Sequence, residues 1–539
     1  MSNGQKVLFI NPPYRRYPPF NYLIADVPAN LTLLAAILLE KGWDVEAFDM
    51  PILKKRLEDA IEAIGNAKPD IIGISSRTSY IFPIVSTLAE LIKQHYPDIP
   101  IVVGGHYVTY KPEEALRAAP AIDYICVGDS DLNIHDIYES VLNKDHEKLK
   151  KIKGVAFREG DNIINTGPGC AIENLDDLPL PAVHLWPLDE YVRQGRRYIT
   201  FISKGCPFNC KFCGTWSTKQ KIRYRSPERI IKEMKTAYDA GFRYFYFFDD
   251  LFTINKELVY KLCDLIHENN MEIKWSCLSH VKMVDEDILK KMAEAGCDIV
   301  AYGVESGSER VLDSVGKSEQ FSYVKNAFRM TQNAGIRAQS FIMFGLPEAR
   351  FEDEVKTFNF INDELKPDDV GVFSFTPYPG TQHYDHPETQ GMRLLIPDLN
   401  RLSLVDAPVH DTNYLTREEL IKFQVMANYM WRSKNRVPKG LKPRRRRDVA
   451  VIRTPEGGLV YNPYQPEEKR TTDMYLSTIK VDEITFDILY FFDGFHSTDR
   501  IATKIGKLYD LPYDKALERV NVVVDYFTNK VELLELNEW

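Results

Sequence analysis

Three cysteines stand close together near the middle of the chain, at positions 206, 210 and 213. Thiolates are the ligands that iron–sulfur clusters prefer, and three of them leave one iron of a cubane open to a ligand that is not protein. Zinc is the competing metal, but it normally takes a fourth Cys or His, and this loop holds neither. A chance group of buried cysteines is the other alternative. The pattern favours a [4Fe–4S] cluster held by Cys206, Cys210 and Cys213.

The residues on either side predict where this loop lies in the fold. An apolar strand is expected over 198–202, before the cysteines. After them, a helix is expected to begin at Pro227, with Ser226 as its N-cap, because both residue types are favoured there. The thiols then follow the carboxyl end of a strand, which is where α/β proteins place their chemistry.

The spacing CxxxCxxC, with Gly205 before it and Phe212 before the last cysteine, resembles the radical S-adenosylmethionine (SAM) superfamily. The resemblance implies that the open iron binds the amino and carboxylate groups of SAM, with Phe212 beside the cofactor. It also implies that one electron passing into the sulfonium releases a 5′-deoxyadenosyl radical, which takes a hydrogen atom from the substrate.

A series of strands and helices over 196–385 predicts a partial (β/α)6 barrel. Strands are expected over 198–202, 244–248, 273–277, 299–303, 340–344 and 370–375. The segments between them are long enough for helices, so the strands should lie parallel. Polar residues at the carboxyl ends of such strands converge on one mouth of the barrel.

The strand ends supply candidate SAM contacts. Asp249 and Asp250 end the second strand, where the superfamily places acceptors for the SAM ammonium; helix capping or a solvated loop is the plainer alternative. Ser276 ends the third strand and is a further candidate, whereas the superfamily often has Arg near His280, which weakens a direct role for this histidine. The stretch around Glu305 resembles the one that meets the ribose hydroxyls.

Two further stretches follow the fifth and sixth strands. Gly345 lies in a stretch that resembles the one flanking adenine. Tyr378 and His383 follow the sixth strand on the expected substrate side, where they are candidates for shuttling a proton; packing within the loop is the alternative for each.

Residues 1–145 alternate strand and helix in the pattern of a parallel sheet covered on both faces. Near-continuous apolar strands are expected over 6–10, 45–49, 71–75, 101–105 and 124–128. Parallel sheets of this kind bind nucleotides and related cofactors beyond the carboxyl ends of their strands. The first domain is therefore a candidate cofactor-binding domain.

This domain resembles the Rossmann-like cobalamin-binding domain. The resemblance rests on Ser75, Ser76, Arg77 and Thr78, followed later by Gly104, Gly105 and His106. It implies that the hydroxyls and the glycine pair line a cleft for the nucleotide tail, with His106 near that tail. A flavodoxin-like domain without ligand is the alternative.

One departure from the family concerns the cobalt ligand. Some cobalamin proteins supply a histidine near the position of residues 24–28, and this sequence has none there. We therefore expect cobalamin bound without a histidine ligand, with Arg77, Thr78 or Tyr80 facing the lower side of the corrin.

The remaining segments are a connector, a linker and a C-terminal module. Residues 146–195 are expected to hold a hairpin and a Pro-rich extended stretch, and residues 386–447 a helix and a basic Arg run. In residues 448–539, Phe491–Gly494 followed by Ser497–Ala502 resembles the PqqD-type peptide-recognition fold. Such a fold pairs a leader peptide with an open sheet edge. A winged-helix-like cap that only stabilises the protein is the alternative.

Composition narrows the class of protein. The chain has 539 residues, 44% hydrophobic and 27% charged, with a formal net charge of −9, which argues against a dedicated nucleic-acid-binding protein. No apolar run is long enough for a membrane helix. The other five of its eight cysteines are scattered, which indicates a reduced, cytoplasmic protein.

Together these resemblances imply a cobalamin-dependent radical SAM enzyme that methylates an unactivated carbon, in a ribosomally made precursor peptide. A second SAM would methylate cobalamin, methylcobalamin would deliver the methyl group, and a flavodoxin- or ferredoxin-type protein would supply electrons. One alternative keeps these cofactors but ends in ring formation, oxidation or rearrangement. Others are a substrate that is not a peptide, and a cobalamin-binding sensor without catalysis.

Overall fold

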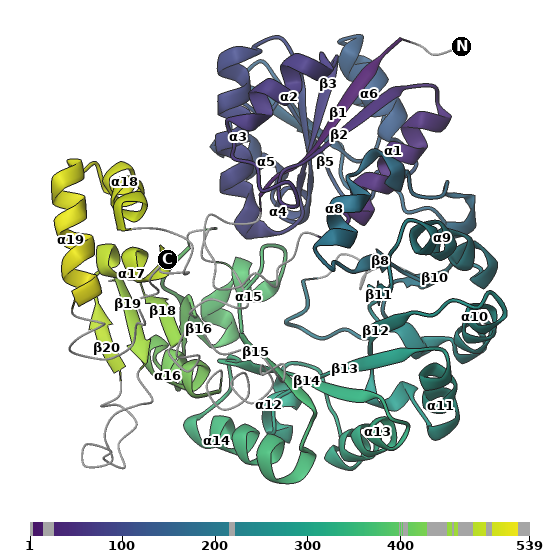
Figure 1. Ribbon diagram of the computed structural model, residues 1–539, viewed down its shortest axis with the longest axis vertical. Coiled ribbons are helices and arrows are strands. Elements are labelled where there is room, and N and C mark those ends of the chain that lie inside the picture. The colour runs from purple at the N-terminus through teal and green to yellow at the C-terminus, as the bar shows by residue number, and fades with distance from the viewer. Residues whose placement is uncertain are drawn as a thin grey trace.

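The structure is a computed structural model. It describes residues 4–13, 26–214, 221–397, 399, 402, 408–427, 450–454, 457–461, 478–491 and 498–525. Figure 1 shows an N-terminal α/β domain at the top, a curved barrel below it, and a small C-terminal unit at the left.

The N-terminal sheet has seven strands in the order β2-β1-β3-β4-β5-β6-β7. The first five are parallel, as predicted, and β6 and β7 are antiparallel. The strands are β1 (Lys6–Asn11), β2 (Asp44–Asp49), β3 (Ile71–Ser76), β4 (Ile101–Gly105), β5 (Tyr124–Cys126), β6 (Val155–Glu159) and β7 (Asn162–Asn165). The hairpin predicted in the connector is thus confirmed, and it extends this sheet.

Helices cover both faces of this sheet, which explains its continuous apolar strands. In β1, Val7 and Phe9 pack on one face with α1 and α6, whereas Leu8 and Ile10 pack on the other with α2, α3 and α5. The helices are α1 (Ala29–Glu40), α2 (Asp59–Ala67), α3 (Phe82–His95), α4 (His106–Tyr110), α5 (Pro112–Ala118), α6 (Ile134–Leu142), α7 (His146–Leu149) and α8 (Leu188–Arg193).

The second sheet has six parallel strands in the order β15-β14-β13-β12-β11-β8. They are β8 (Tyr198–Thr200), β11 (Tyr244–Phe247), β12 (Lys274–Ser279), β13 (Cys297–Glu305), β14 (Arg337–Phe344) and β15 (Asp369–Ser374). All six predicted strands are confirmed. Among the described residues β8 and β15 do not pair with each other, so the barrel is open.

Helices surround the barrel on its outer side (Figure 1). They are α9 (Pro227–Asp239), α10 (Lys256–Glu268), α11 (Glu286–Glu294), α12 (Glu309–Ser314), α13 (Phe321–Asn333) and α14 (Phe351–Asn359). Pro227 begins α9 as predicted, but the Ser226 side chain does not cap the helix. Instead the backbone N–H of Ser226 donates to Asp176 at 2.9 Å.

The chain after the barrel returns to the ends of β14 and β15. It holds α15 (Gln382–Asp385), the antiparallel pair β16 (Met392–Leu394) and β17 (His410–Thr412), and α16 (Arg417–Ala427). The helix predicted within residues 386–447 is confirmed as α16. The Arg run predicted in the same segment, Arg444–Arg447, lies outside the described residues.

The C-terminal unit has a three-stranded antiparallel sheet, β18-β19-β20, followed by helices. Its elements are β18 (Ala450–Thr454), β19 (Gly457–Tyr461), β20 (Thr478–Val481), α17 (Glu483–Phe491), α18 (Thr498–Tyr509) and α19 (Tyr513–Asp525). Residues 492–497, which hold part of the motif that predicts the PqqD-type fold, lie outside the described residues. In the described part of the chain, no helix has both the length and the apolar character of a membrane span.

Candidate SAM and corrinoid site

The three predicted ligands lie together in one segment, Gly205–Gly214, here called the thiol loop. Its cysteines are half-buried, form no disulfide with any described residue, and interact electrostatically with one another. Burial raises the pKa of the Cys206 thiol to about 11. Burial also raises the pKa of the Cys210 thiol, whereas the positive charge of Lys317 lowers it in part. Bound metal stabilises thiolate, so three clustered thiols fit an iron–sulfur cluster.

Asp249 fastens the strand that leads into the thiol loop. It is 2% exposed and accepts hydrogen bonds from the Ile202 N–H at 3.0 Å and the Ser203 hydroxyl at 2.8 Å. Burial raises the pKa of Asp249 to about 7. The SAM-ammonium contact expected of Asp249 does not fit these bonds. Asp250, which accepts from the Gly205 N–H at 3.3 Å, remains the candidate acceptor.

Glu305 lies in a strained segment where β13 ends. Its φ is +63°, and the register between β13 and β14 shifts between Gly303 and Glu305. The ammonium of Lys317 donates to Glu305 Oε1 at 2.9 Å and to the Gly303 carbonyl at 2.8 Å. Burial lowers the pKa of the Lys317 ammonium. The nearby Glu305, Cys210 and Glu319 raise it by more, so the net shift of the pKa is upward. Sequence reasoning missed Lys317.

His280, which follows β12, contacts the thiol loop. Ser276 is buried within the strand, whereas His280 just beyond it stacks on Phe208 with ring centroids 4.3 Å apart. His280 Nε2 lies 2.8 Å from Glu319 Oε1. His280 therefore supports the thiol loop, a role that only the fold reveals.

Gly345 forms a tight turn with partners on both its backbone groups. Its φ is +82°, its N–H donates to Glu354 Oε1 at 2.8 Å, and its carbonyl accepts from His410 Nε2 at 2.9 Å. Burial raises the pKa of Glu354 to about 8 and lowers that of His410 to about 4. His410 comes from β17, so the chain beyond the barrel helps to hold this turn.

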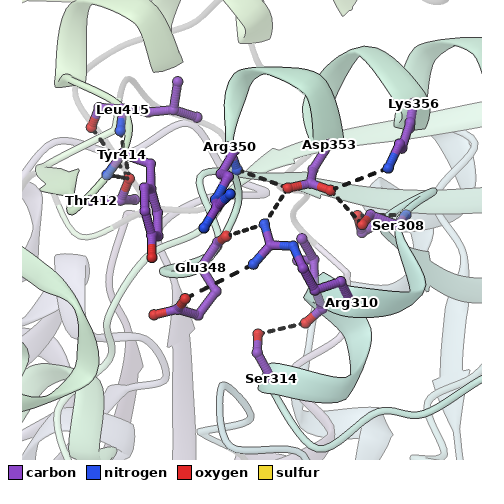
Figure 2. Close-up of polar contacts among 12 residues, drawn as sticks. Ser308, Arg310, Ser314, Glu348, Arg350, Asp353, Lys356, Thr412, Tyr414 and Leu415 are labelled. Carbon is purple, nitrogen blue, oxygen red and sulfur yellow. Dashed lines mark hydrogen bonds and ion pairs between the residues drawn. The ribbon is translucent and has the colours of Figure 1, made fainter.

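The loop after Gly345 is tied to its neighbours by a polar network (Figure 2). Arg310 donates to the Glu348 carbonyl at 2.7 Å and pairs with Asp353. Asp353 also accepts from the Arg350 N–H at 3.1 Å, and the Arg350 guanidinium lies 4.7 Å from the centre of the Tyr414 ring. The loop between β14 and α14 is thus joined to α12 and to the turn between β17 and α16.

Tyr378 and His383 contact the thiol loop. Tyr378 Cβ lies 3.2 Å from the position that a Cβ on Gly214 would take. His383 is 3% exposed, and burial lowers its pKa. A hydrogen bond with the Lys211 backbone raises the pKa, but by less. Both residues thus pack against the thiol loop, and the proton shuttle expected of them stays a prediction.

The carboxyl end of β3 carries buried hydroxyls suited to a ligand. Ser75 accepts from Asn30 Nδ2 at 3.1 Å, but Ser76 Oγ and Thr78 Oγ1 are buried without a hydrogen-bond partner. Buried polar atoms normally have one, so these orphans fit the polar tail of a corrinoid.

The glycine pair has two different reasons for being glycine. A Cβ on Gly105, whose φ is +140°, would lie 2.0 Å from the Ser76 carbonyl, so the neighbouring strand requires this glycine. A Cβ on Gly104 would come no closer than 3.6 Å to Cys126. Only Gly104 therefore leaves space of the kind predicted for the pair.

His106 contacts the thiol loop, and its expected place near the nucleotide tail stays a prediction. Its Nε2–H donates to the Gly214 carbonyl at 2.7 Å, and its Nδ1 lies 3.3 Å from Ser79 Oγ. The Tyr110 hydroxyl donates to the same carbonyl at 3.1 Å. Tyr80 is buried, and Arg77 is half-buried and interacts electrostatically with Asp26 and Asp49.

Two protein-family models match the chain. The radical SAM superfamily model matches residues 200–361, and the B12 binding domain model matches residues 27–135. An uncharacterised methyltransferase of Pyrococcus horikoshii is 30% identical over 420 residues, which cover 77% of this chain and 90% of that protein.

Other similar proteins include a differently named enzyme. The anaerobic magnesium-protoporphyrin IX monomethyl ester cyclase of Rubrivivax gelatinosus is 26% identical over 439 residues, covering 79% of this chain and 76% of that one. Among solved structures, the cobalamin-dependent SAM radical enzyme OxsB with aqua-cobalamin and SAM bound has a TM-score of 0.66 at 17% identity, covering 98% of this chain and 80% of that one.

A second solved structure agrees in fold. The radical SAM methyltransferase TsrM of Kitasatospora setae, with cobalamin and a [4Fe–4S] cluster bound, has a TM-score of 0.61 at 17% identity and covers 72% of this chain and 80% of that one. The chain belongs to the radical SAM superfamily and is a cobalamin-dependent radical SAM methyltransferase. The [4Fe–4S] cluster, SAM and cobalamin predicted from the sequence are confirmed as its cofactors.

Proposed function

We propose that this enzyme transfers a methyl group to an unactivated carbon of a ribosomally made peptide. The observation that carries the proposal is the contact between Gly214, at the end of the thiol loop, and His106 of the B12-binding domain, at 2.7 Å. A radical generated at the thiol loop and a methyl group carried by the corrinoid must reach the same substrate atom. The two binding regions meet at this contact, so one substrate can reach both.

The chain's residues divide between these cofactors. Cys206, Cys210 and Cys213 would hold the cluster, with Phe212, Asp250, Ser276, Glu305 and Gly345 around SAM. Ser75, Ser76, Thr78 and Gly104 would receive the corrinoid tail, and Arg77 and Tyr80 would face its lower side. When bound, the cluster and SAM supply the radical and the corrinoid supplies the methyl group. The residues of both domains would exclude water from the space between them.

The C-terminal unit supports a peptide substrate. Its antiparallel sheet has β18 and β20 as outer strands, and three helices follow it. Within the described residues each outer strand pairs on one side, and pairing of an added strand with the other side is how such sheets bind an extended peptide. We propose that a leader peptide pairs there and brings the core peptide to the barrel. A flavodoxin- or ferredoxin-type protein of the reducing cytoplasm would supply electrons.

A second outcome is favoured by one specific observation. A relative that is 26% identical over 79% of this chain is named a cyclase, so a similar chain carries the name of a ring-closing enzyme. In that outcome the substrate is a small molecule or a peptide that loses hydrogen and gains no methyl group.

Product analysis separates the two outcomes. The full-length enzyme is reconstituted anaerobically with iron, sulfide and cobalamin, then given a reductant, a precursor peptide encoded beside its gene, and SAM with a deuterated methyl group. A labelled methyl group on a peptide carbon supports the proposal. A product that has lost hydrogen and carries no label supports ring formation. If the enzyme releases 5′-deoxyadenosine with a non-peptide substrate and with no precursor peptide, the peptide assignment is wrong.

A further inference from the structure

A short segment after α12, Ser314–Glu319, runs along the middle of the thiol loop and is here called the collar. The Lys211 N–H donates to the Val315 carbonyl at 3.0 Å, and the Lys211 ammonium donates to the Ser314 carbonyl at 2.9 Å. A Cβ on Gly316 would lie 3.5 Å from the Asn209 carbonyl. The collar backbone therefore lies beside the residues that flank Cys210.

The first charged side chain of the collar, Glu319, is linked to the thiol loop by the imidazole ring of His280. Glu319 is 9% exposed and pairs with His280, which stacks on Phe208 at an interplanar angle of 15°. Lys282 Nζ lies 3.6 Å from Glu319 Oε2, but the Lys282 side chain is far more exposed than that of Glu319. This part of the collar fixes the first half of the loop, between Cys206 and Cys210.

The other charged side chain of the collar, Lys317, binds the end of β13 and acts electrostatically on Cys210. Its side chain is 11% exposed, it is bonded to Glu305 and Gly303, and it interacts electrostatically with the Cys210 thiol. A cluster bound by three thiolates is negatively charged, and reduction adds one more electron to it. A buried cation beside one thiolate favours the reduced form, because charge is poorly screened there.

We propose that Lys317 is a positioning residue for the radical-initiating centre: it holds Glu305 in its positive-φ conformation and raises the reduction potential of the cluster. The inference rests on the proposed assignment of the cluster to the three thiols of the thiol loop. It assigns the collar a function in electron uptake that is separate from ligation.

The test measures the cluster before any turnover. Wild type, Lys317→Met, Lys317→Arg and the control Lys282→Met are reconstituted anaerobically, assayed for iron and sulfide, and titrated without SAM while electron paramagnetic resonance (EPR) follows the reduced cluster. At a fixed potential we expect the ratio of reduced to oxidised cluster to fall about tenfold in Lys317→Met, equivalent to about 59 mV for one electron. Lys317→Arg and Lys282→Met should stay close to wild type.

A second variant covers the case in which Lys317→Met takes up no cluster. Glu305→Gln leaves the lysine charge uncompensated, so its cluster should reduce at a less negative potential than that of wild type. A potential unchanged in both variants, with full iron content, overturns the proposal, and so does lowered SAM affinity as the sole defect. A wild type that binds no iron and sulfide instead overturns the assignment of the cluster, and this inference with it.

Discussion

The N-terminal domain and the barrel both contact the thiol loop, but at different places and through different interactions. The N-terminal domain reaches it at its end, where His106 and Tyr110 donate to the single carbonyl of Gly214. The barrel reaches it along its middle, through two hydrogen bonds from Lys211, a ring stack on Phe208 and the charge of Lys317.

The difference indicates which domain fixes the thiol loop and which domain aligns its ligand with it. The barrel side fixes the loop by several contacts that flank the thiols, so cluster binding should depend on the barrel. The N-terminal side makes a smaller contact next to the last thiol, Cys213. We therefore expect the B12-binding domain to align its ligand with a loop that the barrel has already shaped.

The largest expected effect comes from removing the thiol that the barrel side surrounds. Cys210→Ala should abolish the absorbance of the cluster and reduce 5′-deoxyadenosine release to background, because two thiolates do not hold a cubane. Corrinoid binding should persist, since its residues belong to the other sheet. Cys170→Ala, which removes an exposed free cysteine, is the control and should keep both cofactors. Loss of corrinoid binding in Cys210→Ala would refute this division between the domains.

A large effect is also expected where the two domains touch beside the loop. Gly380 has a φ of +87°, and a Cβ there would lie 1.9 Å from the Tyr110 ring. Gly335 has a similar φ of +81° with nothing within 4 Å of that position. Gly335→Ala should cost about 1–2 kcal/mol of unfolding free energy from backbone strain, and Gly380→Ala about 1–3 kcal/mol more from the clash.

Denaturant unfolding measures both glycine variants, and EPR of the reconstituted proteins reports the cluster. We expect Gly380→Ala to retain cluster iron while corrinoid affinity falls. Equal destabilisation of the two variants would mean that Tyr110 does not press on Gly380 in solution.

Acid should weaken the barrel side through His410, which holds the Gly345 turn. Its pKa is about 4 when folded, against an ordinary value of 6.5, so the unfolded chain binds the extra proton between these values. Stability is therefore unaffected by this group above about pH 6.5 and falls as pH drops towards 4, by about 3 kcal/mol in total. Urea unfolding of wild type and His410→Gln from pH 7 to pH 5 measures the difference.

The glutamine variant keeps a hydrogen-bond donor but cannot titrate in this range. Its stability should decline less steeply with acid than that of wild type, since the other histidines are common to both proteins. Parallel pH profiles would show that His410 is not buried as described.

The smallest effect is expected from a single hydroxyl on the N-terminal side. Tyr110→Phe removes one of the two donors to the Gly214 carbonyl and should cost about 0.5–1.5 kcal/mol. Cluster content should stay unchanged, and methyl transfer should fall more than 5′-deoxyadenosine release. Tyr124→Phe is the control, because it removes a hydroxyl that lies 3.4 Å from His146 Nε2 in the same domain. It should leave the ratio of methyl transfer to 5′-deoxyadenosine release unchanged.

The order of strands and helices could be predicted from the sequence because each element has a local pattern of apolar and polar residues. The runs of apolar residues at 101–105 and 370–375 place β4 and β15 to within a residue or so. The cysteine spacing identified the thiol loop for the same reason, since all its ligands lie within eight residues.

The partners of these residues could not be predicted, because they come from distant parts of the chain. Asp249 is a candidate SAM contact from its place at a strand end, but Ile202 and Ser203, 47 and 46 positions earlier, donate to its oxygens. Lys317 and His410 carry no local signal that links them to Glu305 or Gly345. Only the folded sheet brings His410 within reach of a carbonyl 65 residues earlier.

The arrangement of the two cofactors can be tested most directly by magnetic coupling in one sample. The enzyme is reconstituted with cluster and cobalamin, and the EPR spectrum of cob(II)alamin is recorded before and after one-electron reduction of the cluster. Because the thiol loop contacts the B12-binding domain at Gly214, we predict a clear broadening or splitting of the cobalt signal, which Cys210→Ala abolishes. A cobalt signal unchanged beside a fully reduced cluster would contradict the account.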